Sequence, residues 1–194
     1  NLGGTPAKTV PARNCGGTFF CFIKSRKVIR SMSQYTWESR QLNTVNYGLV
    51  NAAHDVTVIL NLGCPDSRAW YLENEETLFA KVDTGKIRLH LKFWNKPLDN
   101  LINGGIANQY IDYQHPAKVR KLIHDIFTNQ DQLNQLTEAQ VAPYLRAIYS
   151  LTEQNNLATN LTAKEITAAG ITGLPSIIVD DELKPEKSFE LKTL

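Results

Sequence analysis

The sequence predicts an α/β fold in which a central mixed β-sheet is flanked by helices and carries an inserted helical subdomain. Three observations predict it. Residues 56–93 contain a strand, a helix and a second strand, which is the size of a βαβ unit. Residues 100–154 repeat apolar positions at intervals of three and four, as amphipathic helices do. A further apolar run, rich in β-branched residues, follows Pro175 and predicts another strand.

The first strand of the unit is predicted over Val56–Leu62, where an almost continuous apolar run is typical of a strand buried on both faces. Gly63 ends this run, and a helix is predicted to begin at Cys64. Its start is indicated by Pro65, because the N–H group that proline lacks has no partner at the first helical position. Its end is indicated by Gly85, a residue that favours the left-handed cap conformation.

The second strand is predicted over Ile87–Phe93, because apolar and polar residues alternate strictly there. Such alternation predicts one buried face and one face nearer to water. Arg88, His90 and Lys92 are therefore expected on a half-exposed face of the sheet.

The helical insertion is predicted to span about residues 100–160, with a strongly amphipathic helix that begins at Pro116. After the insertion, Thr162 and Glu165 have the spacing of a capping box, which predicts a short helix ending at Gly170.

The strand after Pro175 is expected to end at Val179. Residues 180–185 are predicted to form a turn, and residues 189–191 a short antiparallel partner for that strand.

Composition excludes several classes of protein. The chain has 194 residues, of which 42% are hydrophobic and 21% charged, as is ordinary for a globular protein. No apolar run approaches the roughly 18 residues that a membrane helix needs, so no membrane-spanning role is expected. A net charge of +2 provides no electrostatic argument for nucleic acid as a partner.

Charge is distributed unevenly along the chain. Residues 1–31 contain six basic residues and no acidic residue, whereas residues 32–194 contain all 19 acidic residues. We therefore predict a basic amino-terminal extension over 1–31 and one domain over 32–194. If Met32 is the native start, a cytoplasmic location is favoured. If a signal peptide preceded the chain, Cys15 and Cys21 indicate an oxidising, extracytoplasmic compartment.

Cys64 has the features of a reactive thiol. A cysteine at the amino end of a helix lies where free N–H groups and the helix dipole stabilise the thiolate, the nucleophile in thiol–disulfide exchange. The alternative interpretation is an inert buried cysteine. The four histidines lack metal-ligand spacing, and neither a metal nor a cofactor is predicted.

From about His54 to Leu191 the chain resembles the DsbA-like branch of the thioredoxin superfamily. The resemblance rests on the strand at 56–62, the motif Cys64-Pro65-Asp66-Ser67, and the Gly-Leu174-Pro175 segment before the later strand. In that family the motif is Cys-x-x-Cys, and the proline matching Pro175 is cis, lies beside the cysteine and contacts the bound peptide. The resemblance implies two catalytic residues, Cys64 and Ser67. It implies four substrate-binding residues, which are Pro65, Asp66, Leu174 and Pro175.

The sequence departs from the family in three ways. Ser67 stands where the second cysteine is expected, so Cys64 is unable to close an internal disulfide within this motif. Asp66 places a negative charge beside the sulfur, which opposes ionisation of the thiol. The chain also stops at Leu194, where the family continues with a helix. The face of the sheet that this helix covers in the family therefore needs another cover. We expect it to be covered by residues 18–29 or by an interface, such as one between copies of the chain.

These features predict a monothiol thiol–disulfide oxidoreductase. The Cys64 thiolate is expected to attack a protein or low-molecular-weight disulfide, Ser67 to tune the sulfur by a hydrogen bond, and an external thiol to resolve the mixed disulfide. Cys15 and Cys21 are alternative resolving thiols. The competing hypothesis is a binding or scaffold protein that keeps the fold and has lost redox turnover, which the missing second cysteine also favours.

Overall fold

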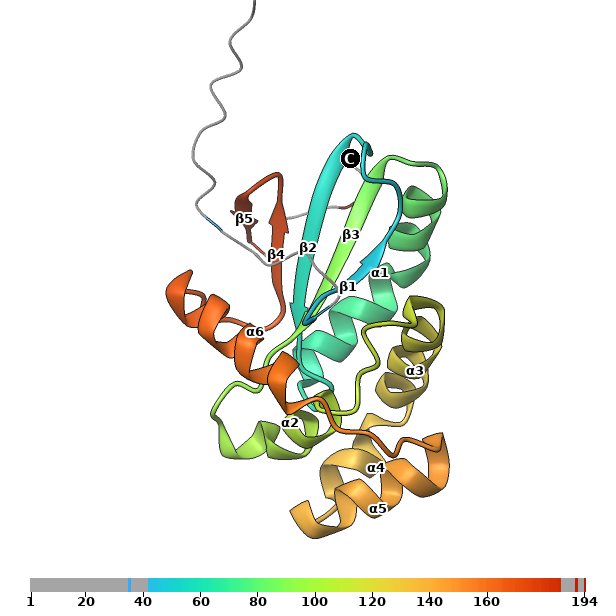
Figure 1. Cartoon of the computed structure of the whole chain (residues 1–194), viewed down its shortest axis with the longest axis vertical. Coiled ribbons are helices and arrows are strands. Elements are labelled where there is room, and N and C mark those ends of the chain that lie inside the picture. Colours follow the sequence, from blue (N-terminus) through green and yellow to red (C-terminus); the bar gives the residue numbers. More distant parts are fainter. Residues whose placement is uncertain (1–34, 36–41, 186–190, 192–193) are drawn as a thin grey trace, which may run out of the picture. The chain divides into compact units, whose positions relative to one another are not determined.

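The computed structural model describes residue 35, residues 42–185 and residues 191 and 194. The strands in this part of the chain form one sheet in the order β1-β3-β2-β4-β5 (Figure 1). They are β1 (Val45–Tyr47), β2 (His54–Leu60), β3 (Ile87–Phe93), β4 (Ser176–Val179) and β5 (Glu182–Lys184). β2 and β3 are parallel and the other neighbouring strands are antiparallel, so the sheet is mixed as predicted. The predicted domain boundary after residue 31 and the candidate cover at 18–29 lie outside the described residues.

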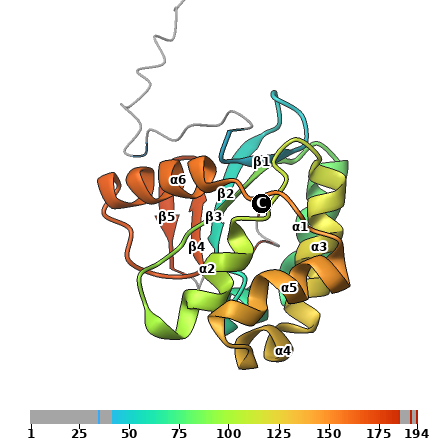
Figure 2. The same cartoon turned by 60° about the horizontal axis from the view of Figure 1, so that its bottom comes forward.

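The helices flank this sheet. They are α1 (Pro65–Asp83), α2 (Ile102–Asn108), α3 (Pro116–Thr128), α4 (Gln130–Gln135), α5 (Glu138–Tyr149) and α6 (Asn156–Ala168). Of these, α2 to α5 lie within residues 100–160, where the insertion was predicted. Gly85 follows α1 with a φ of +69°, which glycine adopts without strain. Figures 1 and 2 show that α2, α4 and α5 lie beyond the carboxyl end of β2. None of the described helices is long and apolar enough to cross a membrane.

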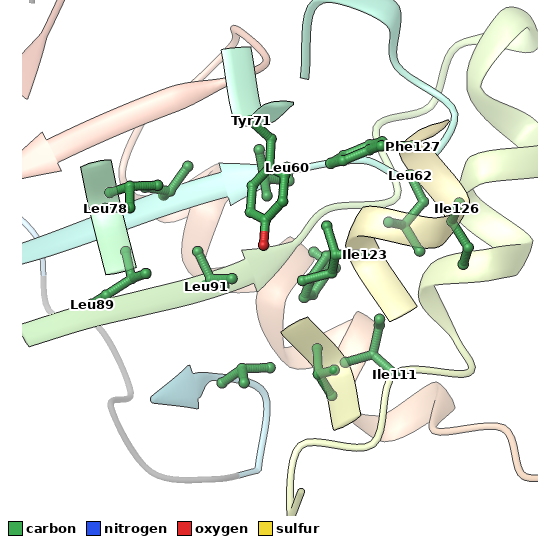
Figure 3. Close-up of a cluster of buried hydrophobic side chains, with 14 of the residues drawn as sticks. Leu60, Leu62, Tyr71, Leu78, Leu89, Leu91, Ile111, Ile123, Ile126 and Phe127 are labelled. Carbon is green, nitrogen blue, oxygen red and sulfur yellow. The ribbon is translucent and has the colours of Figure 1, made fainter. Parts of the chain in front are cut away.

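Two hydrophobic clusters cover the two faces of the sheet. The larger cluster joins β2 and β3 to α1 and α3, and Figure 3 shows its side chains converging between these elements. The labelled side chains of α1, α3, β2 and β3 are Tyr71, Leu78, Ile123, Ile126, Phe127, Leu60, Leu89 and Leu91. The smaller cluster includes Ile59 of β2, Ile166 of α6 and Cys64. Neighbouring residues of β2 thus enter different clusters, and this strand is buried on both faces as predicted.

The expectation of a half-exposed face on β3 is wrong for His90 and Lys92, although Arg88 is half-buried as expected. His90 is 6% exposed, and Lys92 is fully buried. The reason is that α6 covers this face and supplies an acidic partner. Lys92 Nζ lies 2.8 Å from Glu165 Oε2 and donates a hydrogen bond to Thr44 Oγ1 at 2.7 Å. The alternation of residues predicted that Lys92 contacts water, but its charge is neutralised by Glu165 inside the protein.

Helix α6 is longer than the sequence predicted. Its N-cap is Asn155, whose Oδ1 accepts a hydrogen bond from Ala158 N–H at 3.0 Å. Thr162 therefore lies within the helix, buried, and its Oγ1 accepts a hydrogen bond from Asn43 Nδ2 at 3.2 Å. Thr162 and Glu165 therefore do not form the predicted capping box. Their side chains bind partners in other elements and not the backbone N–H groups at the start of a helix.

The antiparallel partner of β4 also differs from the prediction. β5 lies within the segment predicted as a turn, and the turn itself is reduced to Asp180 and Asp181. Both have a positive φ, of 50° and 66°, as residues of a tight two-residue hairpin turn do. The predicted partner at 189–191 lies outside the described residues except for Leu191, which is buried in the larger cluster.

His90 gives the fold an expected dependence on pH. Burial lowers the pKa of His90 below 6.5, although its hydrogen bond to Asp55 acts in the opposite direction. The unfolded chain therefore binds this proton more readily than the folded protein, so stability is lost as the pH falls below about 6.5. Urea unfolding at about pH 7.5 and about pH 5.5 should show a smaller loss in His90→Gln than in the wild type. Equal losses in the two proteins would contradict this role.

Candidate active site

Cys64 lies at the amino end of α1, after the short turn that follows β2. It is the N-cap residue, with extended backbone angles (φ −81°, ψ 120°), and its carbonyl oxygen accepts a hydrogen bond from Arg68 N–H at 3.0 Å. The side chain is a free thiol, and the residue is only 6% exposed. The local sequence explains this position, because the apolar strand ends at Gly63 and Pro65 occupies the first helical position.

Two of the four N–H groups of the turn over residues 61–64 are bound by amide side chains. Leu62 N–H donates to Asn108 Oδ1 of α2 at 3.1 Å. Gly63 N–H donates to Asn61 Oδ1 at 2.8 Å. Both amides are buried, so the turn is held by groups that have no competing contact with water.

The carbonyl groups of the same turn are bound by α4. Gln130 Nε2 donates to Leu62 O at 2.8 Å and to Cys64 O at 3.0 Å. Asn134 Nδ2 donates to Gly63 O at 2.9 Å. Gln130 and Asn134 are four residues apart on one helix, and so their amides face the turn together. Buried backbone carbonyls need such partners.

Helix α2 approaches the turn so closely that Gly104 has no room for a side chain. A Cβ atom at Gly104 would lie 2.1 Å from Asn61 Oδ1 and 2.1 Å from the backbone nitrogen of Gly63. The two backbones are thus in direct contact, which only glycine permits.

Ser67 completes the turn through its hydroxyl group. The residue is fully buried, and its Oγ accepts a hydrogen bond from Asn61 N–H at 3.3 Å. The sequence assigned this hydroxyl to the sulfur of Cys64. The structure also gives Ser67 Oγ a backbone donor, so Ser67 acts on the conformation of the turn that leads to the thiol. The hydrogen bond to the sulfur stays a prediction.

The topology of the sheet brings the Leu174–Pro175 loop to the thiol. β4 runs antiparallel beside β2, with Ser176 opposite Ile59, so the loop before β4 lies at the end of β2 that leads to Cys64. The Leu174–Pro175 peptide bond is cis, and Leu174 belongs to the same hydrophobic cluster as Cys64.

Of the other predicted substrate-binding residues, Pro65 and Asp66 are exposed in the first turn of α1, whereas Pro175 is buried. The structure therefore joins Cys64 to Leu174 inside one cluster and leaves two neighbouring residues of the motif on the surface.

The loop after β3 also borders the thiol, which the sequence did not indicate. Trp94 belongs to the same cluster as Cys64. Lys96 Nζ lies 5.7 Å from the centre of the Trp94 ring and donates to Thr172 O at 2.7 Å. Lys96 thereby ties the loop after β3 to the loop before β4. No local pattern marks these residues, because their roles depend on which loops the sheet brings together.

A cavity lies away from the thiol. It has a volume of about 810 Å³ and lies between α3 and residues 148–155, and Cys64 is not among the residues that line it. In the described part of the chain, no group of three or more His, Cys, Asp or Glu side chains is arranged to hold a metal ion.

Comparison with known proteins identifies the family. The sequence matches the protein family described as thioredoxin over residues 40–192, which is most of the chain. The chain belongs to the thioredoxin family. No curated protein matches the sequence.

Several solved structures resemble this thioredoxin-family chain. A conserved protein of unknown function from Enterococcus faecalis V583 has 29% identity and a TM-score of 0.73, with 79% of this chain and 89% of that chain covered. Oxidised BdbD from Bacillus subtilis has 10% identity and a TM-score of 0.59, with 82% and 94% covered. MdbA, a thiol-disulfide oxidoreductase from Actinomyces oris, has 13% identity and a TM-score of 0.56, with 77% and 80% covered. The predicted thioredoxin-like α/β fold and the DsbA-like resemblance are confirmed at the level of the fold.

Proposed function

We propose that this thioredoxin-family chain carries out thiol–disulfide exchange through one cysteine, Cys64. The observation that supports the proposal most directly is the position of the free thiol, at the amino end of α1 and in one cluster with Leu174 of the cis-proline loop. The N–H groups and the dipole at a helix amino end stabilise a thiolate, the form that attacks disulfides.

The proposed reaction has two steps. The Cys64 thiolate attacks one sulfur of a disulfide RS–SR′, a bond forms between Cys64 Sγ and RS, and R′S⁻ leaves. An external thiolate then attacks the mixed disulfide, takes up RS and releases the Cys64 thiolate. The two steps exchange the partners of a disulfide and leave the protein in its original redox state.

The residues around the thiol have separate roles in this proposal. Ser67 has no sulfur, so the mixed disulfide persists until an external thiol of a protein or a small molecule arrives. The exposed Pro65 and Asp66 meet the substrate at the surface, whereas the buried Leu174 and Pro175 support that surface from beside the thiol. No cofactor takes part in the proposed steps.

The proposal predicts that exchange depends on Cys64. Exchange with glutathione disulfide should fall to the uncatalysed background in Cys64→Ser, because a hydroxyl group does not replace the thiolate. The double variant Cys15→Ser, Cys21→Ser is the matched control and should keep the wild-type rate. Intact mass should detect a glutathione adduct in the control and none when Cys64→Ser is added to that double variant, because no thiol then remains in the chain. Equal exchange rates in the wild type and in Cys64→Ser would overturn the proposal.

A second candidate function is that of a binding protein without redox turnover. The 6% exposure of Cys64 and the serine at position 67 favour it, because the thiol is largely covered and has no internal partner. Under this alternative, the wild type and Cys64→Ser both exchange at the background rate and bind the same unfolded peptide with equal affinity.

A further inference from the structure

The helical insertion is connected to the thiol by the amides of one short helix. Gln130 and Asn134 of α4 together bind the carbonyl groups of Leu62, Gly63 and Cys64, which are three successive residues. Gln130 is fully buried and is the only one of the two that binds Cys64 itself.

The turn has no internal donor for the carbonyl groups of Leu62 and Gly63, whereas the carbonyl group of Cys64 also accepts a hydrogen bond from Arg68 N–H of α1 at 3.0 Å. Its N–H groups are already used, since Leu62 N–H binds Asn108 and Gly63 N–H binds Asn61. A buried carbonyl group that loses its donor is unfavourable, so the turn would move to another conformation if the donor were removed. The conformation before α1 therefore depends on a donor from outside the turn.

We infer that Gln130 is a positioning residue for the thiol of Cys64, an inference that rests on the proposed function. One amide group binds the carbonyl of Leu62, which follows the strand, and the carbonyl of Cys64, which begins the helix. This fixes the distance between the end of β2 and the start of α1. Cys64 thus keeps its N-cap conformation, and its sulfur stays at the amino end of the helix. Gln130 touches no substrate and acts only through the backbone.

The charged groups that face this region remain unchanged in the test. They are Asp66 and Arg68 in the first turn of α1, Asp131 beside Gln130 in α4, Lys96 and Asp99 in the segment after β3, and Lys164 and Glu165 in α6. Arg68 and Asp131 form an ion pair at 2.8 Å, and α2 carries no charged residue.

The test compares two amides with the same kind of bonding. Gln130→Met keeps the length of the side chain and removes both donated hydrogen bonds. Asn103→Leu is the matched control, because Asn103 Nδ2 also donates to two backbone carbonyls, those of Leu133 at 2.9 Å and Leu136 at 2.7 Å. It joins α2 to α4 without binding the turn. Both variants are made in the Cys15→Ser, Cys21→Ser protein, and the rate of iodoacetamide alkylation of Cys64 is measured across a pH series.

In Gln130→Met, the midpoint of the pH profile should move to higher pH and alkylation at neutral pH should slow about two- to fivefold, which is the size of a helix-terminus effect. Asn103→Leu should keep the control profile while losing unfolding stability. An unchanged midpoint in Gln130→Met would overturn the inference. A faster rate at an unchanged midpoint would indicate only that the thiol has become more accessible.

If Gln130→Met does not fold, Gln130→Asn serves in its place, because its amide is one methylene too short to reach both carbonyl groups. An unchanged midpoint in that variant would overturn the inference equally. Alkylation requires no disulfide substrate, so a failure of the exchange assay would reject the proposed function without deciding the role of Gln130.

Discussion

Ser67→Cys is expected to form an internal disulfide with Cys64. The two positions are three residues apart across the first turn of α1, where helix geometry places Cα atoms about 5 Å apart, within the Cα separation that a disulfide bridges. An internal thiol replaces the external one in the second step. Because well-placed intramolecular groups act at effective concentrations far above those of free thiols, the mixed disulfide should disappear at least about a hundredfold faster.

This prediction is checked by counting free thiols after oxidation and by following the glutathione adduct by mass. The Cys15→Ser, Cys21→Ser protein is the background, and Ser67→Ala is the control that stays a monothiol. The reduced form of Ser67→Cys should lose about 1 kcal/mol of stability, because sulfur is a weaker acceptor than Ser67 Oγ for Asn61 N–H. Two thiols that persist after oxidation would show that the two side chains do not meet.

Glu165→Leu is expected to have the largest effect on stability. It removes the carboxylate that lies 2.8 Å from Lys92 Nζ, and the lysine side chain is only 1% exposed. Removing one member of a buried ion pair costs about 3–5 kcal/mol. Urea unfolding at neutral pH measures the loss.

Two controls separate the unpaired charge from other causes. Asp131→Ala removes a surface ion pair whose carboxylate is 77% exposed, and it should cost no more than about 1 kcal/mol. The double variant Lys92→Met, Glu165→Leu replaces both charges by apolar groups and should recover most of the lost stability. If the double variant is as unstable as Glu165→Leu, the loss of the carboxylate beside Lys92 is not the cause.

Much of the fold was predictable because its signals are local. The continuous apolar run of β2 and the proline at the start of α1 each act within a few residues of the chain. The position of Cys64 at the amino end of α1 followed from the same signals. The strand after Pro175 followed from its apolar run of β-branched residues, and the cis conformation of Pro175 followed from the resemblance to the DsbA-like branch.

The surroundings of the site were not predictable in this way. Gln130 is one of three glutamines in a polar helix, and nothing in the sequence near it indicates that it binds the carbonyl of Cys64, 66 residues earlier. Gly104 likewise has no local signal, because its need for glycine comes from the backbone of Gly63.

The sequence by itself determined the order of the elements, the lone thiol of the motif at a helix start and the absence of a second cysteine three residues later. Only the tertiary structure decided that Lys92 is buried against Glu165 and that Ser67 binds the backbone of Asn61. The physical reason is that periodicity and caps act along the chain, whereas the partner of a polar side chain depends on which elements pack against it. The reactive group can therefore be recognised from the sequence, whereas the groups that position it can be recognised only from the fold.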